Sequence, residues 1–141
     1  MKDPELFILI PVDNHIIARQ FYLEILQFQE INSCMYFPFE YCRNVQVLLI
    51  NADEESKKRN IMLQTNEIRF PIARYFLPKN FPTYCKKLYE SKVKFNQLLL
   101  IPGGYFAEIS DPFGNSFEIW CDDFEDSNNT DLTEIDIYRR V

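Results

Sequence analysis

The sequence is poor in the residues that build metal centres and disulfide frameworks. Among its 141 residues there is a single histidine, His15, and a solitary histidine supplies no set of metal ligands. The four cysteines, Cys34, Cys42, Cys85 and Cys121, lie far apart and form no CxxC pair. This spacing argues against a zinc knuckle and a disulfide framework, so we expect reduced, mostly packed thiols.

The chain also lacks a long apolar run and an excess of basic residues. No stretch approaches the roughly 20 apolar residues of a membrane span, and the first segment, MKDPELFILIPVD, breaks at Pro11 and Asp13 too early for a signal peptide. The net charge of -6 disfavours nucleic acid, because such binding depends largely on Lys and Arg. We therefore expect a cytoplasmic protein with no membrane or nucleic-acid partner and with a neutral or cationic ligand.

Apolar and aromatic residues, in contrast, are abundant. Hydrophobic residues make up 47% of the chain and aromatic residues 16%. This composition is that of a folded globule, and the length suits one domain or two small halves that share a core.

The same order of predicted elements occurs twice along the chain. In each half a short apolar run predicts a strand, an amphipathic segment predicts a helix, and three further strand-like runs follow. The first half has strands at 6–12, 28–31, 34–39 and 44–51 and a helix over 15–28, and the second has strands at 69–77, 97–103, 105–110 and 116–122 and a helix over 80–93. Each half is thus predicted to be a βαβββ module.

Composition sets the predicted boundaries between these parts. The first module covers 5–52 and the second covers 67–122, with a charged connector over 53–66. An acidic tail follows over 123–141. Within it, the segment LTEIDIY could form a short strand or helix against a partner subunit, or be disordered.

The two helices are predicted from their apolar faces. Ile17, Phe21 and Ile25 recur at i, i+4 and i+8, with Ala18 and Tyr22 beside them, and Asp13 or Asn14 can cap the start. In the second helix the predicted buried residues are Phe81, Tyr84, Cys85 and Leu88.

Two segments carry a resemblance to a known family: VDNHIIARQFYLEILQF after the first strand, and DPFGNSFEIW near the end of the second module. In the latter, Asp111-Pro112 opens a turn and Gly114 can take the positive φ that reverses the chain. With the two modules, over roughly residues 5–122, they resemble the vicinal oxygen chelate superfamily, which includes glyoxalase I, extradiol dioxygenases and bleomycin-resistance proteins. Members usually have Gly where this chain has Gln27, so the first helix must end in a left-handed non-Gly residue or use a different cap.

The resemblance implies an α+β fold in which the two βαβββ modules form an eight-stranded split barrel, usually in a homodimer. In the enzymes of the family a divalent metal lies in the cup, held by residues of the first and last strands of each module. Carried over, these positions fall near Phe7, Val47, Ile72 with Ala73, and Glu118. Among them only Glu118 can bind such a cation, so we expect no metal and no other cofactor. His15 is interpreted as a surface or capping residue.

Glu118 lies inside an otherwise apolar strand, where a carboxylate is costly unless something uses it. Three uses remain open: a relic satisfied by a neighbouring Tyr or Arg, recognition of a cationic or hydrogen-bond-donating ligand as in the metal-free bleomycin-resistance branch, or a catalytic base. The sequence favours recognition, because it offers aromatic walls and no paired acid and base. Trp120 lies two residues on, at the same parity, and Arg74 is placed to pair with Glu118 or with an anion. The expected ligand-binding residues are Glu118, Trp120, Arg74, Phe7, Phe37, Phe39 and Tyr105, with Tyr36 and Phe106 as further aromatic candidates.

These observations favour a metal-free, homodimeric protein that binds a small organic molecule, including a cationic one, over an enzyme. Two alternatives stay open at this level. One is a metal-dependent lyase or dioxygenase of the same superfamily, and the other is a non-catalytic interaction module whose cup is filled by its own side chains.

Overall fold

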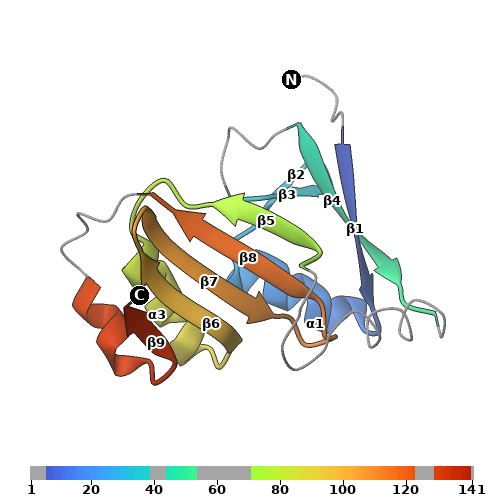
Figure 1. Ribbon diagram of the computed structural model, residues 1–141. Coiled ribbons are helices and arrows are strands. Elements are labelled where there is room, and N and C mark those ends of the chain that lie inside the picture. Colours follow the sequence, from blue (N-terminus) through green and yellow to red (C-terminus); the bar gives the residue numbers. More distant parts are fainter. Residues whose placement is uncertain (1–5, 39–43, 54–70, 123–128, 141) are drawn as a thin grey trace. The chain divides into compact units, whose positions relative to one another are not determined.

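The computed structural model describes residues 6–38, 44–53, 71–122 and 129–140 (Figure 1). The chain divides into two compact units. Unit 1 comprises Met1–Ile72 and Pro112–Asn115, and unit 2 comprises Ala73–Asp111 and Ser116–Val141. Several sequence predictions lie outside the described residues: Phe39, Cys42, nearly all of the connector, the start of the strand predicted over 69–77 and the first part of the tail.

Unit 1 is a βαβββ module. Its strands are β1 (Leu6–Val12), β2 (Gln29–Ile31), β3 (Cys34–Tyr36) and β4 (Val45–Asn51). The helix between β1 and β2 consists of α1 (His15–Arg19) and a π-helical continuation, η1 (Gln20–Ile25). The strands form one sheet in the order β1-β4-β3-β2, in which β1 runs parallel to β4.

Unit 2 repeats this connectivity. Its elements are β5 (Ala73–Phe76), α3 (Phe81–Glu90), β6 (Lys94–Ile101), β7 (Gly104–Ser110) and β8 (Ser116–Cys121), followed by the 3-10 helix η3 (Asn129–Glu134) and β9 (Tyr138–Arg140). The sheet order is β5-β8-β7-β6-β9, and β5 runs parallel to β8 as β1 does to β4 (Figure 1). The predicted α+β class and the two βαβββ modules are confirmed.

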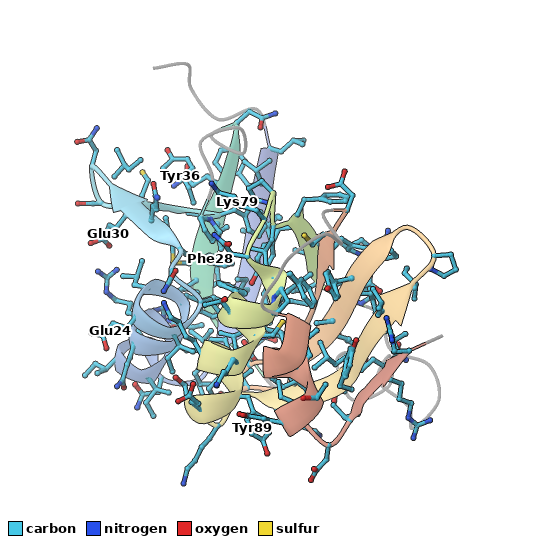
Figure 2. The ribbon with its side chains drawn as sticks, turned by 90° about the vertical axis from the view of Figure 1, so that its left-hand side faces the viewer. Glu24, Phe28, Glu30, Tyr36, Lys79 and Tyr89 are labelled. Carbon is cyan, nitrogen blue, oxygen red and sulfur yellow. The ribbon has the colours of Figure 1, made fainter. Side chains whose placement is uncertain are left out.

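The core of unit 2 lies between α3 and one face of its sheet. All four apolar residues predicted for α3 are buried, while Tyr89, near the end of the helix, is exposed and points outward (Figure 2). The Tyr75 hydroxyl on β5 bonds that of Tyr84 at 2.8 Å, and burial raises the pKa of Tyr84 above its ordinary value. Buried on the same face are Leu98, Tyr105, Ala107, Ile109, Phe117, Ile119 and Cys121.

The first helix begins at Asn14, whose side-chain oxygen accepts hydrogen bonds from the backbone N–H groups of Ile16 and Ile17, each at 3.0 Å. The apolar stripe predicted on this helix is partly wrong, because Ile17 is 45% exposed. The π-helical hydrogen bond from Leu26 N–H to the Phe21 carbonyl spans five residues instead of four. The buried stripe of this helix consists of Ala18, Phe21, Tyr22 and Leu26.

Both helices are followed by a left-handed residue that is not glycine. Gln27 has φ 64° and Lys92 has φ 64°, and both side chains are exposed. The left-handed alternative predicted for Gln27 is therefore confirmed. The same conformation recurs at the equivalent point of unit 2, so neither module uses glycine for the αL conformation in which helices commonly end.

The DPFGN segment forms the turn between β7 and β8. Gly114 takes φ 88°, as its place in the turn predicted. The Asn115 side-chain amide donates a hydrogen bond of 2.9 Å to the carbonyl of Pro11 in β1. The asparagine of this motif therefore binds the first strand of unit 1, a role that sequence reasoning did not assign.

The end of the chain folds against unit 2. Leu132 and Ile135 are buried, Glu134 pairs with Lys86 of α3 at 3.5 Å, and β9 pairs in parallel with β6. This segment therefore packs on its own module, and β9 covers the β6 edge of the sheet. No helix in the described ranges has the length and apolar composition needed to cross a membrane.

The left-handed residue after the first helix generates a stability prediction. A Cβ atom in this conformation destabilises the folded protein by roughly 1–2 kcal/mol, and glycine avoids that cost. The greater freedom of glycine in the unfolded chain offsets about 0.4–1 kcal/mol of the gain. Replacement of Gln27 by Gly should therefore stabilise the protein by about 0.5–1 kcal/mol. Urea unfolding followed by circular dichroism measures the change.

The matched control is Gln27→Ala, which shortens the side chain but keeps the Cβ atom that causes the strain. It should bring no stabilisation. A gain for alanine equal to that for glycine would show that the side chain, and not the backbone conformation, limits stability here.

Candidate functional site

The sheet of unit 2 has one face covered by α3 and an opposite face, which we call the Glu118 face. Side chains alternate along each strand, and register partners on neighbouring strands point to the same side. The strand pairing therefore assigns each residue to one of the two faces of the sheet. The Glu118 face carries Arg74, Phe76, Gln97, Leu99, Phe106, Glu108, Glu118 and Trp120.

The polar side chains of this face form a row across four strands. Arg74 of β5 is the register partner of Glu118 in β8, Glu118 faces Glu108 of β7, and Glu108 faces Gln97 of β6. The row holds one guanidinium, two carboxylates and an amide.

An apolar row runs beside it. Phe76 is the register partner of Trp120, Trp120 faces Phe106, and Phe106 faces Leu99. The Trp120 and Phe106 rings meet edge to face, with centroids 4.8 Å apart and an interplanar angle of 65°. Phe76 is 53% exposed, so one end of the row is open to solvent.

Glu118 links the two rows. Its Oε1 atom accepts a hydrogen bond from Arg74 Nε at 2.5 Å and one from Trp120 Nε1 at 3.3 Å. The predicted shared side of Glu118 and Trp120 and the predicted pairing with Arg74 are both present. Two donors on one oxygen hold the carboxylate in place and leave Oε2 without a hydrogen-bond partner among the residues that the structure describes.

The charges of the site are unevenly exposed. The Glu118 side chain is 15% exposed and that of Arg74 is 65%, so the carboxylate is largely shielded while the guanidinium reaches solvent. Glu108 is 5% exposed and lies directly opposite Glu118. Like charges opposite each other are unfavourable, and Arg74 on the other side of Glu118 offsets part of that repulsion.

Four of the predicted ligand-binding residues belong elsewhere or are not described. Phe7 lies on β1 of unit 1, where it is 58% exposed. Tyr105 is 1% exposed and stacks on Phe81 of α3, with centroids 5.0 Å apart. Phe37 is buried in unit 1 against Phe28, with centroids 5.1 Å apart. Tyr105 and Phe37 are therefore packing residues in this arrangement, and Phe39 lies outside the described ranges.

Four residues of this face were missed from the sequence, Phe76, Gln97, Leu99 and Glu108. Phe106 was ranked below Tyr105. Glu108 stands in the apolar run YFAEIS much as Glu118 stands in SFEIWC, so its position in the strand could have marked it. The choice between Tyr105 and Phe106 needed the register with β8, which places Phe106 opposite Trp120.

The pairing also revises the positions carried over from the family. In unit 2 the first-strand residue level with Glu118 is Arg74, not Ile72 or Ala73. In unit 1 the residue level with Phe7 is Gln46, while Val47 is buried and points to the opposite face. If the ligand positions on paired strands are register partners, they fall on Phe7 and Gln46 in unit 1 and on Arg74 and Glu118 in unit 2.

This set does not fit a metal ion. The Phe7 side chain has no atom that could bind a metal ion. The guanidinium of Arg74 is itself a cation and already forms an ion pair with Glu118. No cluster of three or more His, Cys, Asp or Glu side chains suited to a metal occurs within the described ranges. His15 is exposed at the start of α1, where its Nε2 atom bonds Asn51 Oδ1 at 2.7 Å.

Comparison with solved structures identifies the fold. A glyoxalase/dioxygenase from Nostoc punctiforme is similar with a TM-score of 0.62 and 18% identity, over 82% of this chain and 88% of that one. The fosfomycin resistance protein FosX from Listeria monocytogenes gives 0.61 and 14%, over 89% and 98%. An antibiotic-binding protein from Streptomyces sp. CB03234 gives 0.54 and 20%, over 86% and 97%. The chain therefore has a glyoxalase-like fold.

Sequence comparisons add no closer assignment. No family model matches the chain, and no curated protein matches it.

The exposure of Arg74 predicts a weak ion pair. In a double-mutant cycle with Arg74→Gln and Glu118→Gln, the coupling free energy should be about 0.5–1 kcal/mol, because a largely solvated guanidinium gains little from pairing. Urea unfolding of the four proteins, followed by circular dichroism, gives the value. A coupling above about 3 kcal/mol would mean that the pair behaves as a buried salt bridge.

Proposed function

We propose that the protein binds a small aromatic organic molecule on the Glu118 face of unit 2, without a metal ion. The observation that carries this proposal is the arrangement of Glu118: Arg74 and Trp120 both donate to Oε1, and a partly exposed aromatic row lies alongside. A fixed carboxylate beside aromatic rings suits a ligand that stacks on the rings and donates a hydrogen bond to Oε2.

The charges of the row set the expected preference. Arg74 neutralises Glu118, so the site is less acidic than the sequence suggested, but Glu108 adds a second carboxylate beside it. A cationic ligand can displace the exposed guanidinium at little cost. We therefore expect neutral or cationic aromatic molecules with an N–H or O–H donor to bind better than anions.

The structural neighbours support this choice of function class. One is described as antibiotic-binding and another as a fosfomycin resistance protein. Binding of a small organic molecule on the same fold is the property that we carry to this chain. The homodimer and the cytoplasmic location expected from the sequence remain predictions, and the exposed apolar side chains of Phe7, Leu9 and Ile50 in unit 1 support a partner surface.

Metal analysis tests the metal-free part of the proposal. Because Phe7 and Arg74 replace two of the four expected ligands, protein purified without chelator should contain no stoichiometric zinc, nickel, iron or manganese. Elemental analysis of the purified chain provides the measurement. About one tightly bound ion per chain would refute metal-free binding and restore the metal-dependent enzyme as the better assignment.

Ligand titration tests the role of Glu118. Glu118→Gln preserves the shape of the side chain and removes its charge, so affinity for a bound cationic aromatic should fall by about 1.5–3 kcal/mol, the range for a hydrogen bond to a charged group. Trp120 is the only tryptophan of the chain, so its fluorescence reports binding at this face directly. The panel consists of cationic, neutral and anionic aromatic compounds.

Glu90→Gln is the matched control, since Glu90 is exposed at the end of α3 and the change in net charge is the same. It should leave every affinity unchanged. If wild type and Glu118→Gln bind each cation equally, Glu118 is not the recognition group. Tighter binding of anions than of cations by the wild type would identify Arg74 as the group that sets ligand charge.

A further inference from the structure

Unit 1 contains a cavity of about 220 Å³. Its lining includes His15 and Arg19 from α1, Glu30 from β2, Met35 from β3, and Val47 and Leu49 from β4. Glu30, Met35, Val47 and Leu49 lie on one side of the sheet by register. That side also carries the buried Ile10 and Val12 of β1, so the cavity lies between the helix and the sheet.

The short β3 strand explains why a hollow forms here. β3 pairs with β4 only at Met35 and Tyr36, whose partners are Val47 and Gln46, while β4 continues to Asn51. The preceding turn holds Asn32 and Ser33, both at positive φ, and leads the chain from β2 into β3. The last residues of β4 thus extend past the β3 ladder and face the cavity beside α1.

The lining has an apolar floor and two polar ends. Met35, Val47 and Leu49 supply the floor. At one end Arg19 Nη2 pairs with Glu30 Oε2 at 2.6 Å. At the other, His15 Nε2 and Asn51 Oδ1 share a hydrogen bond of 2.7 Å.

The ion pair is open to a ligand. The Arg19 and Glu30 side chains are 51% and 36% exposed, so neither has lost its access to water. The remaining N–H groups of Arg19 and the second oxygen of Glu30 have no partner among the described residues. One cation and one anion, side by side above an apolar floor, complement a molecule that carries both charges and no net charge.

We propose that this cavity binds a small α-amino acid with an apolar side chain. The carboxylate of the ligand accepts hydrogen bonds from Arg19, its ammonium group donates to Glu30, and its side chain packs on Met35, Val47 and Leu49. The volume agrees with this size of ligand, because about 220 Å³ is below the roughly 300–1,000 Å³ of sites for drug-sized molecules. The site involves no residue of the Glu118 face and does not depend on its function.

The first experiment compares three ligands on the wild-type chain by NMR titration of the backbone amides. L-Valine carries both charges, its methyl ester lacks the carboxylate, and N-acetylvaline lacks the ammonium group. Saturable shifts at the cavity residues with L-valine, and much weaker binding of the other two, are expected. Absence of saturable shifts with L-valine, or equal binding of N-acetylvaline, would overturn the proposal.

The second experiment uses charge-removing variants. Arg19→Gln and Glu30→Gln should each weaken L-valine binding about ten-fold or more, as loss of a charge-assisted hydrogen bond does. Glu24→Gln is the matched control, because Glu24 is an exposed carboxylate on the helix while Glu30 lies on β2 (Figure 2). Wild-type affinity in folded Glu30→Gln, or equal losses in Glu30→Gln and Glu24→Gln, would also overturn it. The ligand comparison needs no variant, so it decides the question even if one fails to fold.

Discussion

The parallel pairing of the first and last strands in each module is the constraint on which the rest of the structure depends. β1 and β4, like β5 and β8, are separated in the chain by a helix and two strands, yet they are neighbours in the sheet. In unit 2 this pairing joins Arg74 to Glu118, 44 residues away, and sets Phe76 level with Trp120. A slip by one residue would send these side chains to opposite faces, so the candidate site exists only in this register.

Alternation along the strands then divides core from candidate site. Tyr105 and Phe106 are adjacent in the sequence, but the first stacks on Phe81 under α3 and the second meets Trp120 on the Glu118 face. The α3 side of the sheet is almost wholly apolar, so hydrophobic burial there stabilises the unit. The other side is free to hold a row of charges, whose cost is reduced by hydrogen bonds to Glu118 and by the solvent around Arg74.

The helices show how the modules accommodate local strain. Both are followed by a left-handed residue other than glycine, and the first widens into a π-helical turn before it ends. The regular turn that precedes it places His15 and Arg19 four residues apart, on one side of α1. There they line the cavity of unit 1, where the end of the β3 ladder leaves β4 uncovered. In each unit the proposed binding surface thus lies where a strand or helix places charged side chains next to apolar ones.

The sequence by itself determined the order of elements, the α+β class, the turn at Gly114, the buried side of α3 and the common side of Glu118 and Trp120, because these follow from periodicity and local backbone preference. It also marked Gln27 as a departure, and the helix end there is left-handed as one alternative predicted. Tertiary structure alone decided that Arg74, and not Ile72 or Ala73, is the register partner of Glu118. It likewise decided that Gln46, and not Val47, is the register partner of Phe7. It also placed Glu108 and Phe76 on the Glu118 face. It also decided that Ile17 is exposed and that the chain's last strand pairs with β6. The reason is that register and face depend on pairing between strands far apart in the chain, and no local pattern fixes which residues of two such strands stand side by side.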